Sequence, residues 1–160
     1  MSNAAVFKID PKLDLVLERM VDVSPEAMWA AWTKPDLIKK WFTPAPWTTV
    51  ECSIDLKPGG LFATTMRSPD GQEFPNNGCY LEIVENEKLV FTDALTASYR
   101  PSEGGFFTAM ILLERQGLGT KYTVVAMHKD EAGKKKHEAM GFHQGWGKAL
   151  DQMLALIRAM

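Results

Sequence analysis

The sequence is poor in the residues that build disulfide frameworks and metal centres. Its 160 residues include only two cysteines and three histidines. Cys52 and Cys79 fall inside apolar, strand-like stretches, and two thiols alone make neither a disulfide framework nor a metal site. The His-Glu-x-x-His and Cys-x-x-Cys spacings are both missing. We therefore expect no metal ion or other cofactor, and we take the reducing cytoplasm as the default location.

Long hydrophobic runs and an excess of one charge are missing as well. No apolar stretch approaches the roughly 20 residues that a membrane-spanning helix needs, and the N-terminus lacks the pattern of a secretory signal. Eighteen basic and twenty acidic side chains give a formal net charge of -2, with a lysine run only at residues 134–136. Because phosphate neutralisation requires a basic face, we expect no nucleic-acid partner.

The composition is that of an ordinary globular protein, with 46% hydrophobic and 24% charged residues. A chain of this length fits one domain, which we place at residues 8–160. The first residues are left out because Ser2, Asn3 and Ala4 have the character of an added tag.

Residues 24–42 are the most informative stretch, because they encode two short helices with a sharp break between them. Ser24 can cap a helix N-terminus, and Pro25 suits the first helical position. Pro35 disfavours helical geometry at Lys34 and can begin a second helix. Aromatic side chains at positions 29, 32, 41 and 42 give this helix pair a large apolar surface, which predicts packing against a sheet.

Alternating apolar and polar residues predict an antiparallel, meandering sheet, with turns at Gly- and Pro-containing segments. Residues 97–105 form the longest predicted loop, and residues 72–77 a polar connection. After Asp130 the period becomes helical, which predicts one long terminal helix with Gly141, Gly145 and Gly147 in its first half. The predicted strands lie at residues 13–21, 48–55, 61–67, 78–85, 89–93, 106–115 and 120–129.

Several segments, in this order and spacing, together resemble a known superfamily. Residues 13–159 are similar to the SRPBCC superfamily, which includes START lipid-transfer domains and the birch-pollen allergen, and most of all to its branch named after the activator of the heat-shock protein 90 ATPase. Where many members of this branch have a second tryptophan, the chain has Phe42. The segments that carry the resemblance are residues 23–35, Lys40-Trp41, 55–60, Pro69-Asp70-Gly71, Gly119-Thr120 and 143–150.

The resemblance implies an α+β helix-grip fold: a curved antiparallel sheet of about six to seven strands wrapped around a long C-terminal helix, with two short helices after the first strand. It also implies an internal cavity between sheet, helix and loops. Members of the superfamily include carriers of apolar ligands, polyketide cyclases and aromatases, and co-chaperone-like proteins, so the fold by itself does not select a function.

Strand periodicity groups candidate cavity residues without deciding which face is inward. Phe62 and Met66 share one face of their strand, and His128 ends a mostly apolar row. The strand of Met110 is apolar on both faces, so either could be inward. A packed core and a cavity wall explain these patterns equally well, and the resemblance favours the cavity. The residues that we place at or near the cavity are Trp41, Phe62, Met66, Tyr80, Met110, His128, His143, Trp146 and Leu150.

His143 and Trp146 could present an imidazole and an indole N–H to a bound carbonyl or hydroxyl. The competing interpretation is a histidine that bonds to the backbone. A shared metal is disfavoured, because His137 and His143 lie about 120° apart around a helix.

We therefore expect a protein that binds a small hydrophobic molecule in an internal cavity. One alternative is a cyclase-like or hydrolase-like enzyme that uses the same cavity and requires His143 or Tyr80. The other is a co-chaperone-like interaction protein, which is disfavoured because the chain carries no separate N-terminal domain of the kind that eukaryotic activators have. Exposed sheet edges would allow a homodimer.

Overall fold

The two predicted helices after the first strand are present in the computed structural model, which describes residues 8–160. Ser24 caps α1 (Pro25–Thr33), since its Oγ accepts a hydrogen bond from Ala27 N at 3.1 Å. Lys34 is extended and precedes α2 (Pro35–Trp41). The proline at the start of α2 thus separates the two helices, because it disfavours helical geometry in the residue before it.

A seven-stranded antiparallel sheet forms the rest of the framework, in the order β1-β9-β8-β5-β4-β3-β2. Strands β2 to β5, β8 and β9 follow one another as a meander, and β1 pairs with β9, for example Leu17 opposite Val124. The strands are β1 (Asp14–Val21), β2 (Thr48–Ile54), β3 (Leu61–Arg67), β4 (Glu73–Val84), β5 (Lys88–Thr92), β8 (Thr108–Gln116) and β9 (Gly119–Met127).

Two predicted connections contain regular structure. The polar stretch expected to be a connection opens β4, because Glu73 pairs with Arg67 across the hairpin and extends the strand. The predicted long loop contains β6 (Leu95–Thr96), the 3-10 turn η2 (Ala97–Tyr99) and β7 (Arg100–Pro101), with β6 and β7 paired.

The terminal helix is interrupted, where one continuous helix was predicted. It consists of α3 (Glu131–Ala139) and the longer α4 (Phe142–Ala159). Gly141 has a φ of 94° at the junction, a left-handed conformation that other residues adopt at a cost. The pattern of apolar residues did not reveal this break, because α3 is mostly polar and the helical apolar period begins only at Phe142.

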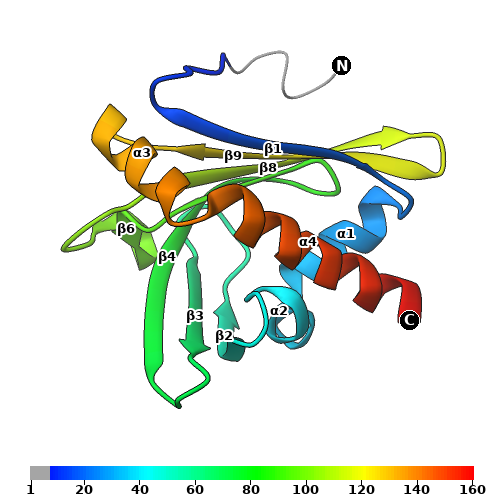
Figure 1. The fold of residues 1–160 in the computed structure, drawn as a ribbon, viewed down its shortest axis with the longest axis horizontal. Helices are drawn as coiled ribbons and strands as arrows, with labels where there is room; N and C mark the ends of the chain where they lie inside the picture. The colour runs from blue at the N-terminus through cyan, green and yellow to red at the C-terminus, as the bar shows by residue number, and fades with distance from the viewer. Residues whose placement is uncertain (1–7) are drawn as a thin grey trace.

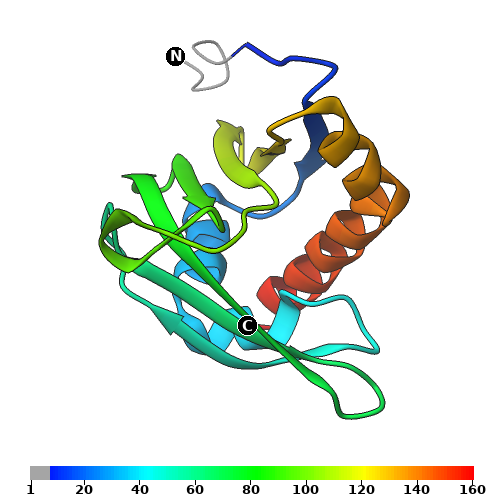
Figure 2. The ribbon, with the colours of Figure 1, turned by 90° about the vertical axis from the view of Figure 1, so that its left-hand side faces the viewer.

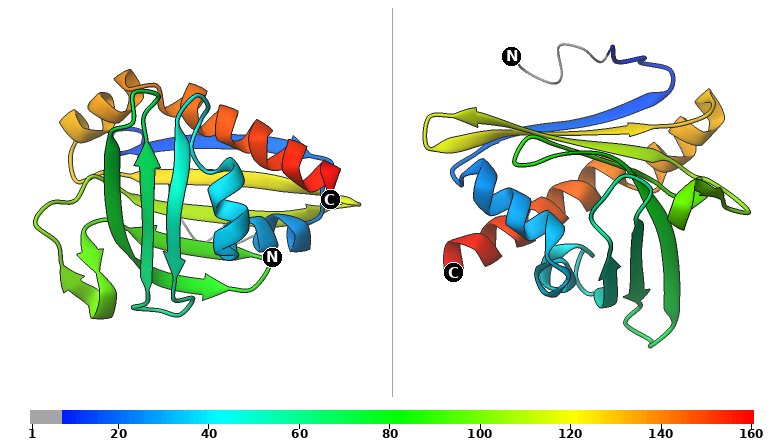
Figure 3. Two further views of the ribbon diagram at one scale, coloured as in Figure 1. Left: turned by 90° about the horizontal axis from the view of Figure 1, so that it is seen from below. Right: turned by 180° about the vertical axis from the view of Figure 1, so that it is seen from behind.

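The sheet is strongly bent, so that β2, β3 and β4 run across the direction of β1, β8 and β9 (Figure 1). Helices α1, α2 and α4 all lie on the same, inner side of this sheet (Figure 3). Seen from the end, α3 and α4 face β3 and β4 across the interior (Figure 2). The arrangement is the α+β helix-grip fold that was predicted, with seven main strands.

The main core fills the space between the helices and the inner face of the sheet. Trp32 and Met28 from α1 are fully buried there, together with Leu150 and Met153 from α4. A smaller apolar cluster of Val90, Met110, Leu112 and Val125 lies apart from this core. Among residues 8–160, no helix has the length and hydropathy that crossing a membrane would require.

Candidate functional site

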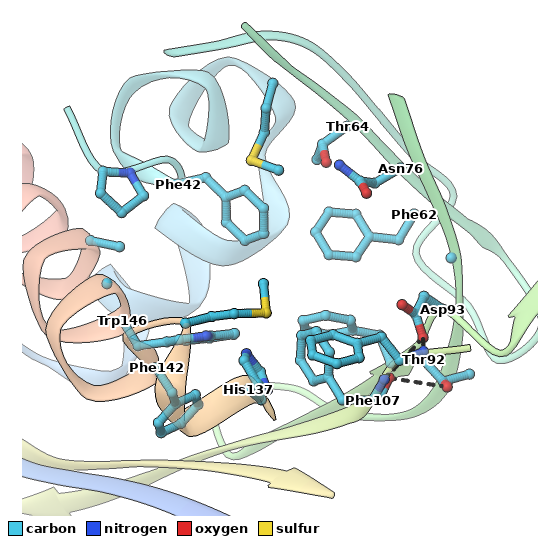
Figure 4. Close-up of a pocket in the computed structure, with 18 of the residues that line it drawn as sticks. Phe42, Phe62, Thr64, Asn76, Thr92, Asp93, Phe107, His137, Phe142 and Trp146 are labelled. Carbon is cyan, nitrogen blue, oxygen red and sulfur yellow. Dashed lines mark hydrogen bonds between the residues drawn. The ribbon is translucent and has the colours of Figure 1, made fainter. Parts of the chain in front are cut away.

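A cavity of about 620 Å³, partly open to the surface, lies between α4, the α3–α4 junction and strands β3 and β4. Figure 4 shows aromatic side chains on both sides of it, with Thr64, Asn76, Thr92 and Asp93 on the sheet side. The volume falls within the range of about 300–1,000 Å³ that is typical of small-molecule sites. The residues that line it are Trp41, Phe42, Pro44, Phe62, Thr64, Met66, Asn76, Asn77, Gly78, Phe91, Thr92, Asp93, Phe106, Phe107, His137, Met140, Gly141, Phe142, Gly145, Trp146 and Ala149.

One face of α4 supplies the helical wall. Phe142, Gly145, Trp146 and Ala149 recur at intervals of three and four residues, so they share that face. A Cβ built on Gly145 meets no atom within 4 Å. This glycine therefore leaves open space beneath the helix where any other residue would project a side chain.

The sheet supplies the opposite wall through alternate residues of β3. Phe62, Thr64 and Met66 all line the cavity, which shows that their face of the strand is the inward one. The aromatic rings continue from there: Phe62 lies 5.9 Å from Phe42 and 4.9 Å from Phe91 between ring centroids. The wall is thus continuous from the sheet to α2.

Trp32 supports this aromatic wall from behind. Its ring contacts those of Trp41, Phe42 and Trp146, with centroids 4.8, 5.7 and 6.3 Å away. Its Nε1 donates a hydrogen bond to the Tyr122 hydroxyl at 3.1 Å. Because this donor is satisfied within the core, the tryptophan is held in a single position.

Two polar residues at the end of β5 face the cavity from the sheet side. Asp93 Oδ1 accepts hydrogen bonds from the backbone N–H groups of Phe106 and Phe107, at 2.7 and 3.1 Å. Thr92 Oγ1 accepts from Ala94 N at 3.1 Å. The two bonds to Asp93 position Phe106 and Phe107, which both line the cavity. Figure 4 shows Thr92, Asp93 and Phe107 at this part of the wall.

On the helical side, His137 from α3 lines the cavity and is paired with His128, which follows β9. Nε2 of His128 lies 2.8 Å from Nδ1 of His137, and Nδ1 of His128 lies 2.8 Å from the Leu13 carbonyl oxygen. Burial and the neighbouring His128 lower the pKa of His137 to about 4. The ring is therefore neutral at physiological pH.

Four of the predicted cavity residues line this cavity: Trp41, Phe62, Met66 and Trp146. Leu150 and Tyr80 are fully buried behind the lining, where Tyr80 stacks on Phe62 at 5.2 Å between centroids. Periodicity predicts that a residue is buried, but it does not distinguish a residue in the wall from one behind it.

Three predicted residues lie elsewhere. Met110 belongs to the smaller cluster, because Ala109 and Ile111, not Met110, turn toward the main core. His143 is exposed, and its Nε2 lies 3.2 Å from the Val16 carbonyl oxygen of β1. His128 reaches the cavity only through its contact with His137. The backbone-bonded interpretation of His143 is the one that the structure shows.

Sequence reasoning overlooked several lining residues that carried detectable signals. Phe142, Gly145 and Ala149 share the helical face of Trp146, so the same period that selected Trp146 would have selected them. Phe106 and Phe107 form an adjacent aromatic pair after a Gly-rich segment. For His137 no such signal existed, because α3 is mostly polar and shows no apolar face that would mark His137 as buried.

The thiol and phenol groups near the cavity are not activated. Burial raises the pKa of Cys52 to about 11, although Lys39 acts in the opposite direction. Burial also raises the pKa of Tyr80 well above its ordinary value, and Cys52 adds to this effect. Both groups therefore stay protonated at neutral pH. Within residues 8–160, no group of three or more His, Cys, Asp or Glu side chains could hold a metal ion.

A bent antiparallel sheet, a long helix across its inner face and an apolar cavity between them define a helix-grip protein. The family model described as "Activator of Hsp90 ATPase homolog 1-like protein" matches residues 22–158, and the chain belongs to this family. The resemblance to the SRPBCC superfamily is thereby confirmed. Membership places the chain on a fold suited to hydrophobic ligands, with no particular role assigned.

Solved structures with the same fold include one with substantial sequence identity. The chain is similar to protein NE0264 from Nitrosomonas europaea, with 44% identity, a TM-score of 0.92, and coverage of 94% of this chain and 97% of that one. An AHSA1-like protein from Aeromonas hydrophila has 21% identity and a TM-score of 0.71, with coverage of 92% and 93%. A protein from Rhodobacter sphaeroides has 18% identity and a TM-score of 0.82, with coverage of 96% and 97%. Among curated proteins, none matches the chain.

Proposed function

We propose that this protein binds a small hydrophobic molecule in the cavity between α4 and the curved sheet. The observation that carries the proposal is the cavity itself, with a volume of about 620 Å³ and a mainly apolar wall that contains several aromatic rings. Transfer of apolar surface from water into such a site is favourable by roughly 25 cal/mol per Å². Membership in a family with this fold supports the same interpretation.

Ligand binding has more support than the catalytic alternative, in which a reaction in the cavity requires His143 or Tyr80. The exposed His143 bonds to the β1 backbone, and Tyr80 lies behind the wall with a protonated hydroxyl. Neither residue lines the cavity. A cyclase-like or hydrolase-like reaction would therefore need other groups.

Two glycines of α4 allow a direct test. Leucine at Gly145 would project into the cavity, whereas leucine at Gly147 would project from a position outside the lining. Both positions have open space for a Cβ, and both substitutions replace a helical glycine by a better helix former. The Gly147→Leu variant is therefore a matched control for folding and helix stability.

The probe is N-phenyl-1-naphthylamine, a neutral aromatic dye whose fluorescence rises in apolar surroundings. We expect wild type and Gly147→Leu to bind it, and Gly145→Leu to bind it at least about tenfold more weakly. Equal affinity of the two leucine variants would place the binding site outside this cavity. Native mass spectrometry of protein purified without organic solvent would reveal any ligand that is retained during purification.

A further inference from the structure

The two histidines beside the cavity form a chain of hydrogen bonds with a defined direction. It begins at the Leu13 carbonyl oxygen and passes through His128 to His137. A carbonyl oxygen can only accept, so Nδ1 of His128, at 2.8 Å from it, carries the proton. His128 is buried, and burial favours its neutral form, in which the other nitrogen, Nε2, is an acceptor.

The same reasoning assigns the proton positions on His137. Its Nδ1 lies 2.8 Å from the acceptor Nε2 of His128, so Nδ1 of His137 carries a proton and donates it. The ring is neutral at physiological pH because burial and His128 lower its pKa to about 4. Nε2 of His137 is therefore unprotonated, with a lone pair that can accept a hydrogen bond.

The imidazole of His137 lies in apolar surroundings at the cavity wall. The rings of Phe106, Phe107 and Phe142 surround His137, with centroids 4.7, 4.8 and 5.2 Å away. The residue is only 7% exposed, and it lines the cavity (Figure 4). Since Nδ1 is turned to His128, the ring edge directed away from that contact is the one that contains Nε2.

We propose that the cavity selects hydrophobic molecules that carry a neutral hydrogen-bond donor, such as a hydroxyl group, and that Nε2 of His137 accepts this bond. The inference rests on the proposed binding function and names the chemical class of ligand for the same site. His128 and the Leu13 carbonyl act as positioning groups, because they hold His137 in the tautomer that accepts.

An ionised carboxylic acid fits this site less well than a hydroxyl. Its negatively charged oxygens would lie next to the lone pair of His137, which repels them. They would also lie in the same cavity as the side chain of Asp93. The Nζ of Lys136 lies over the Phe106 ring, 5.9 Å from its centroid, where it interacts with the ring. A neutral donor satisfies His137 without placing an additional charge in an apolar cavity.

Three matched probes test the proposal in titrations at neutral pH: 2-naphthol donates a hydrogen bond, 2-methoxynaphthalene does not, and 2-naphthoate is an anion. We expect wild type to bind 2-naphthol about tenfold more tightly than 2-methoxynaphthalene, and 2-naphthoate more weakly than 2-naphthol. In His137→Phe, which keeps an aromatic ring at this position, the two neutral probes should bind equally. His143→Phe, outside the cavity, should retain the wild-type preference.

The possible outcomes distinguish the proposed role of His137 from the proposed binding function. A preference for 2-naphthol that persists in His137→Phe would overturn the role of His137, while cavity binding would stand. Failure of wild type to bind any of these probes or the phenylnaphthylamine dye would overturn the binding function and this inference with it. Tighter binding of 2-naphthoate than of 2-naphthol would show that the site selects anions instead.

A measurement on the unmodified protein tests the proposal even if the His137→Phe variant does not fold. Nitrogen-15 NMR of the imidazoles should show protonated Nδ1 and unprotonated Nε2 in both His128 and His137. Addition of 2-naphthol should shift the Nε2 resonance of His137 and leave that of His143 unchanged. A protonated Nε2 on His137 in the free protein would contradict the proposal.

Discussion

The two indole N–H groups of Trp32 and Trp41 both have partners inside the core. Trp32 donates to the Tyr122 hydroxyl, and Trp41 Nε1 donates to the Ala31 carbonyl oxygen at 2.9 Å. Buried donors without partners cost about 1–3 kcal/mol each, so these bonds let large aromatic rings support the cavity wall without that cost. The hydroxyl of Tyr80 differs: within the described chain it is buried and has no hydrogen-bond partner.

At the residue scale, we expect Tyr80→Phe to raise the free energy of unfolding by about 1 kcal/mol, because it removes an unpartnered buried hydroxyl and keeps the ring that stacks on Phe62. The matched control is Tyr122→Phe, which leaves Trp32 Nε1 without its acceptor and should lower the same quantity by about 1–2 kcal/mol. Urea denaturation measures both. A loss of stability in Tyr80→Phe as large as that in Tyr122→Phe would mean that a water bonds to the Tyr80 hydroxyl.

At the scale of secondary-structure elements, the break between α3 and α4 decides which side chains reach the cavity. His137 lies in the last turn of α3, and Phe142 begins α4. Gly141 between them adopts the left-handed conformation that allows the chain to change direction. The junction therefore brings an imidazole and a phenyl ring, 5.2 Å apart, to the same end of the cavity.

Alanine substitutions at Gly141 and Gly145 should change the free energy of unfolding in opposite directions. Gly141→Ala is expected to lower the free energy of unfolding by about 1 kcal/mol, because a Cβ is disfavoured at a φ of 94°. Gly145→Ala, inside α4 with open space for the methyl group, should raise it by roughly 0.5–1 kcal/mol. Thermal and urea unfolding provide the comparison. If both variants were stabilised, α3 and α4 could join into one continuous helix, and the break would not be required.

At the scale of the whole molecule, the cavity between the helices and the sheet depends on hydrogen bonds that hold α4 to segments far from it in sequence. Gln152 accepts a hydrogen bond from Ala45 N at 2.9 Å and donates to the carbonyl oxygens of Trp41 and Thr43 at 2.9 and 3.0 Å. These partners belong to the end of α2 and the segment that leads to β2. One side chain thus ties α4 to the segment that contributes Pro44 to the cavity wall.

We expect Gln152→Ala to lower the free energy of unfolding by about 2 kcal/mol, because three backbone groups lose their partner at once. Lys148→Ala is the control: it removes one exposed hydrogen bond to Ala45 O, and its effect should stay below about 0.5 kcal/mol. Chemical denaturation of the two variants tests this. Equal effects would mean that the segment is held by packing and not by Gln152.

Local signals in the sequence were sufficient for the helix pair and for most of the main sheet, but not for the first half of β4, for β6 and β7, or for the break between α3 and α4. Ser24, Pro25 and Pro35 act within a few residues of their own positions, and they begin and separate the helices as predicted. The alternation of side chains likewise defined the strands, and the ordered motifs identified the family. Of the candidate site, Trp41, Phe62, Met66 and Trp146 were found at the wall because burial and periodicity select the inner faces of a helix pair, a strand and α4.

Two features could not be predicted from the sequence and depend on the tertiary structure. They are the inward face of the apolar strand β8 and the hydrogen-bond partner of His137. Met110 and Ala109 are equally compatible with a buried strand, and only the bending of the sheet around α4 turned Ala109 toward the main core. His128 contacts a carbonyl oxygen 115 residues away, and His137 bonds to His128 across the connection from β9 to α3. A periodic pattern reports which residues share a face, whereas the position of that face depends on contacts between distant segments.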